Sequence, residues 1–298
     1  MKAKRNKVNN NELMRTKINV IIAFLAIFLV ISCSKKESLD DPIINLADND
    51  AVSEALLDDI FNSVDDAEIR LEDYLKGETK SDEAETCPAV TFDRPPDSNW
   101  PKTVTIDYGT GCTGFYDNTR SGKIIINLTG PRLEEGSVRT VTFDNYYING
   151  IKVEGTKQVT NLGLNDDQKM EFSVTLTGGK ITLEDGQVIE RSFERQRVWM
   201  VGKETANIWD DEFQITGTAT GVNRNGTGYT NTIITPVLLK RACRFAVSGV
   251  IRLDIEGLSE PVELDYGDGE CDATAVITIA GKSKEITLRY RYTLCKCN

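Results

Sequence analysis

Hydrophobic and polar residues alternate with a period of two through much of the chain after Cys87. In residues 170–177 apolar side chains at the even positions alternate with polar ones, and residues 286–293 repeat the pattern. Such alternation is typical of strands with one dry face and one wet face. Further strands are predicted at residues 104–108, 123–128, 138–148, 213–219 and 262–266.

Pairs of turn-forming residues separate these strands. They favour tight hairpins because they reach positive φ at little cost. No helix-length periodic segment interrupts residues 87–298, which disfavours an α/β fold with parallel strands. The pattern therefore predicts an all-β body, built as an antiparallel meander or a β-sandwich. The turn pairs are Asn149-Gly150, Gly178-Gly179, Asp185-Gly186 and Asn225-Gly226.

The segment before this body has a helical period. In residues 51–77 apolar side chains recur at steps of three and four, and acidic side chains fill the positions between them. We expect one amphipathic helix whose apolar stripe packs on the body or on a second copy, with docking of a partner as the alternative. Residues 78–86 are polar and are expected to form a linker. The apolar positions are Val52, Leu56, Ile60, Val64, Ala67, Leu71 and Leu75, and the acidic ones are Asp58, Asp59, Asp65, Asp66, Glu72 and Asp73.

A basic start and a short apolar run open the chain. The run covers twelve residues, 20–31, whereas a bilayer span needs about 20. Ser32 and Cys33 follow it, so the segment resembles the signal peptide and lipobox of bacterial lipoproteins, among them the uncharacterised β-rich lipoproteins of the Bacteroidota. The resemblance implies that residues 1–32 are removed and that Cys33 carries diacylglycerol and palmitate. The membrane would then be a partner through this anchor.

Charge is concentrated beside the predicted anchor. The net charge is +5 in residues 1–33, −12 in residues 34–86 and −4 in residues 87–298, which gives −11 overall. Residues 33–50 are therefore predicted to form an acidic tether. A nearly neutral body argues against nucleic acid as a partner, because phosphate binding needs clustered Lys and Arg.

The residues after Cys33 indicate a location. In lipoproteins of the Bacteroidota, acidic residues soon after this cysteine are associated with export to the outer surface, and Glu37, Asp40 and Asp41 resemble that signal. Ser34 and Lys35 occupy positions where other bacteria place an aspartate that retains lipoproteins in the inner membrane. We expect a lipoprotein of the outer membrane, either surface-exposed or facing the periplasm.

Two similar segments lie near the ends of the body. Residues 104–112 and 262–271 share an Asp-Tyr-Gly turn followed by a cysteine, and each has a second cysteine upstream. We expect two related units, residues 87–130 and 243–294, and an exported chain favours disulfides. The spacing suggests bridges joining Cys87 to Cys112 and Cys243 to Cys271. Cys295 and Cys297 would pair with each other or with neighbouring strands.

The second of these segments is rich in oxygen ligands. Asp265, Asp268, Glu270 and Asp272 lie within eight residues, as a calcium site would require. The first segment keeps only Asp107 of these acids, so a structural turn accounts for both copies. The sequence leaves calcium binding by this loop undecided and predicts no other metal site.

Histidine is absent from all 298 residues. The chain therefore lacks the Ser-His-Asp and Cys-His arrangements and the commonest general base. The acids at 210–212 are expected to form a solvated loop, and Arg191, Arg195 and Arg197 a solvated face. We expect a protein without enzymatic activity or cofactor, and the alternative is a polysaccharide hydrolase that uses two carboxylates.

The function expected from these features is a non-catalytic binding or structural module of the cell envelope. Its ligand would be a glycan or a protein, contacted by exposed aromatic side chains. Ordinary packing within the sheet is the competing explanation for each of these aromatics. The candidates are Tyr146, Tyr147, Trp199, Trp209 and Tyr229.

Overall fold

The computed structural model describes residues 41–77, 87–95, 99–114, 117–205 and 207–288. It contains one long helix, α2 (Asp41–Leu75), followed by strands and a single turn of 3-10 helix, η2 (Ile208–Asp210). The predicted all-β body with one preceding helix is confirmed. The strands are β1 (Ala89–Phe92), β2 (Lys102–Asp107), β3 (Cys112–Thr113), β4 (Thr119–Leu128), β5 (Val138–Ile148), β6 (Ile151–Leu164), β7 (Met170–Thr182), β8 (Val188–Val201), β9 (Glu212–Val222), β10 (Gly228–Lys240), β11 (Ser248–Ile255), β12 (Val262–Asp268), β13 (Thr274–Ile279) and β14 (Lys282–Thr287).

The strands form one antiparallel sheet of 14 strands. Each strand pairs with the next along the chain, except that β2 pairs with β4 and the short β3 pairs with one end of β4. The architecture is thus a meander, the first of the two forms that the sequence allowed. Consecutive hairpins of this kind need no long crossover connections.

Three of the four predicted turn pairs lie between strands. Asn149-Gly150 joins β5 to β6, Asp185-Gly186 joins β7 to β8, and Asn225-Gly226 joins β9 to β10. The prediction for Gly178-Gly179 was wrong, because both glycines lie inside β7. They form a bulge where the register between β7 and β8 shifts, and a Cβ on Gly179 would come within 2.5 Å of the Arg191 carbonyl oxygen. A close approach of two backbones accounts for glycine there.

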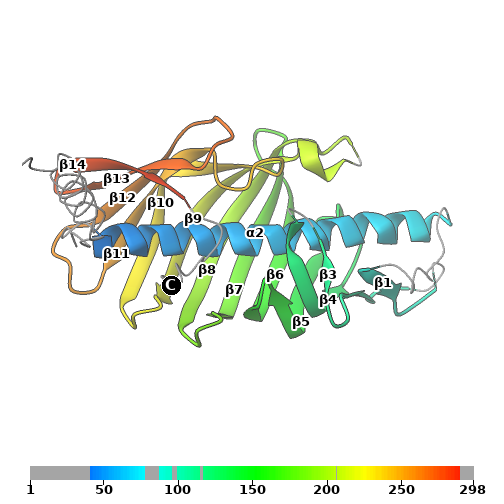
Figure 1. Ribbon diagram of the computed structural model, residues 1–298. Coiled ribbons are helices and arrows are strands. Elements are labelled where there is room, and N and C mark those ends of the chain that lie inside the picture. The colour runs from blue at the N-terminus through cyan, green and yellow to red at the C-terminus, as the bar shows by residue number, and fades with distance from the viewer. Residues whose placement is uncertain (1–40, 78–86, 96–98, 115–116, 206, 289–298) are drawn as a thin grey trace, which may run out of the picture. The chain divides into compact units, whose positions relative to one another are not determined.

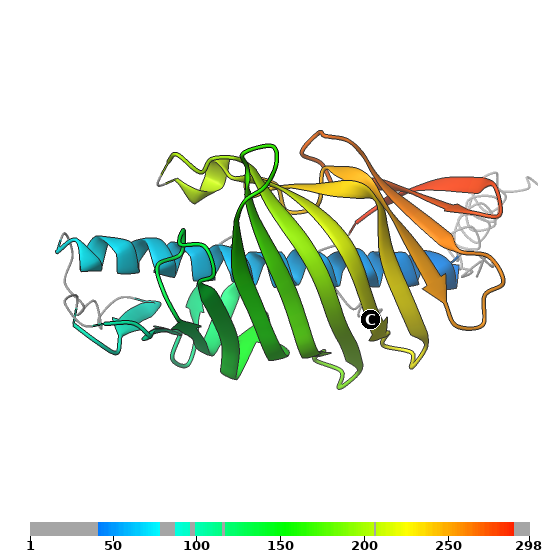
Figure 2. The ribbon, with the colours of Figure 1, turned by 180° about the vertical axis from the view of Figure 1, so that it is seen from behind.

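The helix lies along one face of the sheet, which we call the inner face. Figure 1 shows α2 in front of the sheet, and Figure 2, from behind, shows it beyond the strands. The buried apolar residues form two cores, and α2 contributes to both. Leu57 and Phe61 belong to a core with residues of β6–β14, whereas Ile60 and Val64 belong to a core with residues of β1, β2 and β4–β8. The predicted packing of the helix on the body is therefore observed.

The helix is longer than the sequence predicted. It begins at Asp41, so residues 41–50, which we had assigned to the tether, are helical, and it ends at Leu75. Ala47 and Ala51 are buried against the body, and this packing extends the helix toward its N-terminus. Pro42 is compatible with the first turn, where a backbone N–H has no partner within the helix. The side chain of Val52 lies outside the described residues.

Each of the two similar segments is a hairpin closed by a disulfide. Cys87 and Cys112 flank β1 and β2, and Cys243 and Cys271 flank β11 and β12, so both suggested bridges are present. In both hairpins the aspartate of the turn accepts a hydrogen bond from the glycine N–H two residues later, at 2.8 Å for Asp107 and 2.9 Å for Asp265. The tyrosine between them is buried in each case.

The helices of the described residues include none that is both long enough and apolar enough to cross a membrane.

Candidate functional site

The contact between α2 and the inner face is densely charged. Residues 41–75 contain eleven acids and one base. The charged side chains that face α2 from the sheet and its loops are predominantly basic. They are Arg120, Arg132, Arg139, Lys157, Arg191, Arg195, Arg197 and Arg241. We call this set and the acids of α2 opposite it the charged interface.

Two acids begin the interface near the N-terminal end of α2. Arg191 of β8 donates to both Asp50 and Glu54, and Arg195 of the same strand also donates to Glu54. Asn231 of β10 donates to the second oxygen of Asp50 at 2.6 Å. The spacing of Asp50 and Glu54, four residues apart, places them on one side of the helix, opposite one strand.

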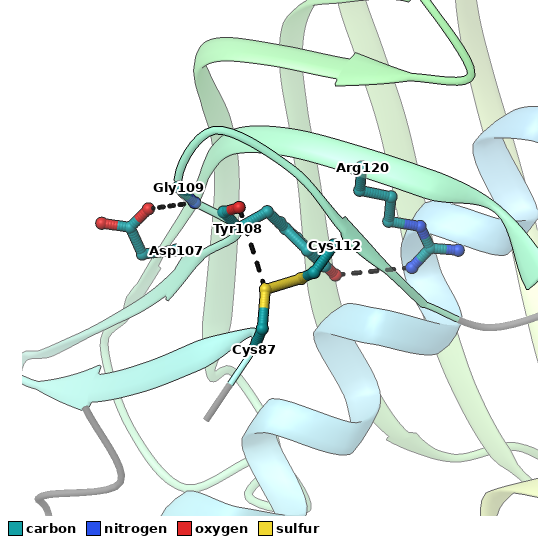
Figure 3. Close-up of a disulfide and its surroundings, with 6 residues drawn as sticks. All are labelled: Cys87, Asp107, Tyr108, Gly109, Cys112 and Arg120. Atoms are coloured by element: carbon teal, nitrogen blue, oxygen red, sulfur yellow. Dashed lines mark hydrogen bonds between the residues drawn. A yellow bond between two sulfur atoms is a disulfide. The ribbon is translucent and has the colours of Figure 1, made fainter. Parts of the chain in front are cut away.

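The middle of the interface is held by one arginine from β4. Arg120 Nη2 donates to Asp59 Oδ2 at 2.6 Å, and Arg120 Nη1 donates to Ser63 Oγ at 2.5 Å. Its side chain also points to the hydroxyl of Tyr108, which lies beside the Cys87–Cys112 disulfide (Figure 3). The disulfide-closed hairpin thus borders the arginine that binds the helix.

The C-terminal part of α2 makes a second group of ion pairs. Asp65 accepts hydrogen bonds from Arg139 of β5, at 2.5 Å, and from Arg241, which follows β10. Arg139 also donates to Glu68. Asp65 therefore joins two basic residues that lie 102 positions apart in sequence.

The pKa values follow from burial and from these partners. Burial alone raises the pKa of Glu54, but Arg191 and Arg195 outweigh it and lower the pKa to about 2. One turn further on, burial raises the pKa of Asp58, because its basic neighbours compensate less. Burial also lowers the pKa of Arg197 to about 10. Neighbouring acids on the same helix face thus differ in how strongly their charged forms are stabilised.

Small cavities remain between α2 and the inner face. One of about 50 Å³ is lined by Glu54, Asp58, Arg195 and Arg197 together with apolar side chains such as Phe213. A second, of about 30 Å³, is bordered by Asp58, Lys157 and Arg197. A water molecule needs roughly 10–15 Å³ by this kind of measure. Each cavity therefore has room for a few water molecules or a very small ligand.

The arginines of β8 were wrongly assigned to a solvated face. Arg191 and Arg197 are buried, and Arg195 is largely covered by the helix. The sequence carried a signal for this position, because all three share odd numbering with the buried Ile189, Phe193 and Trp199. Residues of equal parity in a strand share a face. The basic residues therefore had to lie on the apolar side.

The acids at 210–212 do not form the expected solvated loop. Asp211 is buried, forms an ion pair with Arg241 at 3.3 Å, and accepts a hydrogen bond from Trp199 Nε1 at 3.0 Å. Burial, partly offset by the Trp199 hydrogen bond, raises the pKa of Asp211 to about 6. Only the flanking Asp210 and Glu212 keep contact with solvent.

The aromatic contact candidates belong mainly to the interior. Trp199 and Tyr146 are buried, and the hydroxyl of Tyr229 accepts a hydrogen bond from Arg191 at 3.0 Å. Tyr147 and Trp209 are half-buried. Packing in the interior therefore accounts for Tyr146, Trp199 and Tyr229, and these three rings do not form an exposed binding surface.

The calcium candidates lie in the C-terminal part of β12, which contains Asp265 and Asp268, and in the turn after it, which contains Glu270 and Asp272. Asp265 accepts from the Gly267 N–H, and Asp272 Oδ1 accepts at 2.9 Å from both the N–H and the hydroxyl of Thr274. Across the described residues, no group of three or more acidic or cysteine side chains is placed to hold a metal ion. Among the described residues, the positions of Asp265, Asp268 and Asp272 therefore do not favour a calcium site over a structural turn.

Three of the predicted site residues lie outside the described part of the chain. They are the lipid-attachment candidate Cys33 and the C-terminal Cys295 and Cys297.

Comparisons with protein-family models, with curated proteins and with solved structures found no match to this chain.

Proposed function

We propose that this chain is a lipid-anchored protein of the bacterial cell envelope, and that its β body is a non-catalytic binding or structural module. The observation that carries the proposal is the continuity between the predicted anchor and α2. The helix begins eight positions after Cys33. Because α2 is bound to the inner face by apolar packing and buried ion pairs, it would tie the body to the lipid.

Location in the outer membrane is part of the same proposal. It is supported by the residues after Cys33, which resemble an export signal and lack a retention aspartate. The body would then either face the periplasm or be displayed on the cell surface. Protease treatment of intact cells distinguishes these two arrangements, because peptides from residues 87–298 are released without lysis only from a surface-exposed body.

The hydrolase alternative has one observation in its favour. Glu54 and Asp58 line the same cavity, and their pKa values are displaced in opposite directions, as in a pair of catalytic carboxylates. However, a cavity of about 50 Å³ has room for a few water molecules and not for a sugar ring. Glu54 is also held by two arginines. We therefore place the non-catalytic function first.

Metabolic labelling with an alkynyl fatty acid tests the anchor. The wild-type chain, expressed in a bacterium, should incorporate the label and partition with the membrane fraction. Cys33→Ser should abolish labelling, whereas Ser34→Ala, which changes the adjacent residue, should retain it. A wild-type chain that takes up no label would refute the proposal.

A further inference from the structure

Arg197 of β8 occupies a point where three cavities meet beneath α2. It borders the cavity of about 50 Å³ and two others of about 30 Å³ each. Lys157 of β6 and Asp58 of α2 border one of the smaller cavities with it. The space is therefore enclosed by the helix on one side and by β6 and β8 on the other.

Both bases at this point are buried, with 5% of Lys157 and 8% of Arg197 exposed. Within the described part of the chain, no hydrogen bond or ion pair joins either side chain to an acceptor, and Arg197 Nε is buried without a partner. Their contacts are with aromatic rings. Lys157 lies over Phe61, and the Arg197 guanidinium lies 3.4 Å from the centre of the Phe213 ring. Such rings attract a cation but accept no ordinary hydrogen bond.

Among the described residues, neither Lys157 nor Arg197 has a carboxylate at ion-pair distance. Asp58 is the acid that faces both Lys157 and Arg197. The neighbouring acids are already bound to other bases, since Glu54 is held by Arg191 and Arg195, and Asp65 by Arg139 and Arg241. Among the described residues, Asp58 is thus the carboxylate near both bases that is not bound to another base, whereas Asp211, which also lies near Arg197, is paired with Arg241. Consistent with this, burial and then the charge of Arg197 lower the pKa of Lys157 well below its ordinary value.

We propose that this space binds a small monocarboxylate, with its carboxylate between Lys157 and Arg197. A guanidinium and an ammonium group are together suited to a carboxylate, because they supply several donors and a positive charge. A carboxylate there would supply an acceptor for Arg197 Nε, which is buried without a partner among the described residues. The rest of the wall is apolar and includes Leu57, Phe193 and Ile215, which matches a short hydrocarbon tail.

The size of the cavities limits the ligand further. Spaces of about 50 and 30 Å³ correspond to only a few water molecules. Both spaces border Arg197 and together have room for about five to eight water molecules, so a ligand that spans them can be an acid with two to four carbons, such as acetate, propionate or butyrate. The site makes no use of Cys33, so it would exist with or without lipid attachment, and the two proposals fail independently.

Binding is tested with the full-length chain purified in detergent and with ¹³C-labelled butyrate followed by NMR. Acetate, propionate and sulfate serve as competitors at equal ionic strength. We expect a saturable bound signal that propionate displaces and sulfate does not. Lys157→Met and Arg197→Met should each weaken butyrate binding by roughly tenfold or more, since each removes a charge-assisted contact.

The control variant is Arg252→Met, which removes an arginine that is exposed on the sheet. It should bind butyrate as the wild type does. Lys157→Met replaces a buried cation that has no acceptor, so folding should be retained, and circular dichroism verifies this. Absence of saturable binding to wild type, equal binding by Lys157→Met, or displacement by sulfate as effective as by propionate would each overturn the proposal.

Discussion

Arg120 of β4 and Asp59 of α2 are joined by an ion pair in which both side chains are only 1% exposed. They are 61 positions apart in sequence. Removing two charges from water is costly, and a buried pair is stable only when further hydrogen bonds satisfy the remaining groups. Ser63 accepts from Arg120, and Asn118 donates to Asp59 at 2.8 Å. This pair therefore specifies where along the inner face the helix is bound.

Protonation of Glu54 should lower the free energy of unfolding in acid. Its pKa falls from 4.5 to about 2 on folding, because Arg191 and Arg195 outweigh the effect of burial. A depressed carboxyl pKa contributes stability that is fully present above about pH 4.5 and is lost as the pH falls toward 2. The contribution is about 3 kcal/mol.

Urea unfolding of the wild type and of Glu54→Gln, from pH 2.5 to pH 6, measures this contribution. The difference in unfolding free energy should be largest above pH 4.5 and should shrink at lower pH. The other acids of the interface are present in both proteins, so their contributions cancel in the difference between the two unfolding free energies. A difference that does not vary with pH would contradict the assignment.

Gly122 in β4 should not tolerate a side chain. Its φ is +78°, and an added Cβ would overlap the carbonyl oxygen of Asn145 on β5. Gly109 also has a positive φ, of +55°, but no atom lies within 4 Å of an added Cβ. Both substitutions by alanine cost roughly 1 kcal/mol in backbone strain, and only Gly122→Ala adds a collision between strands. Thermal unfolding should show a clearly larger loss for Gly122→Ala, and equal losses would exclude the predicted register.

The two disulfides should each contribute to stability through the loops that they close. The sequence separations are 25 and 28 residues, for which chain-entropy arguments give about 3–4 kcal/mol each. The paired variant Cys87→Ser/Cys112→Ser should lower the urea midpoint by a similar amount to Cys243→Ser/Cys271→Ser. Peptide mapping without reductant should recover both linked peptides from the oxidised wild type, and free thiols at these positions would contradict the assignment.

Lys157→Met should unfold at the same temperature as the wild type, or at a higher one. A buried cation without an acceptor costs desolvation energy, and an apolar side chain of similar length removes that cost. Arg191→Met is the contrasting variant, because it leaves Asp50 and Glu54 without their main partner. Its expected loss is about 3–5 kcal/mol. A larger loss for Lys157→Met than for Arg191→Met would contradict this account of the interface.

Much of the sheet was predictable because strand alternation is a local property. The predicted runs between residues 104 and 266 lie in strands, and the turns at Asn149-Gly150, Asp185-Gly186 and Asn225-Gly226 were correct. The run at residues 286–293 overlaps β14 at residues 286–287, and its residues 289–293 lie outside the described part of the chain. The bridge from Cys243 to Cys271 followed from the similarity of two distant segments. Gly178-Gly179 was misplaced because a glycine pair serves equally in a turn and in a bulge, and only the neighbouring strands distinguish them.

The charged interface was missed for a different reason. Acids between the apolar positions of a helix are normally solvated, so the amphipathic pattern gave no sign that Asp59 and Asp65 would be buried. In the structure both are buried, because the sheet surrounds the helix with basic side chains from several strands. The position of basic residues on the apolar face of β8 indicated that they are buried. Which acid each of them binds depends on contacts between distant segments, and the sequence does not show these.

The most direct test of the charged interface is a double-mutant cycle on Arg120→Met and Asp59→Leu. Each single variant should lose about 3–5 kcal/mol in urea unfolding, because it leaves one buried charge alone. The double variant should lose much less than the sum, since neither charge remains, and the coupling should exceed about 2 kcal/mol. Additive losses, with a coupling near zero, would show that α2 is not held on the inner face by this pair.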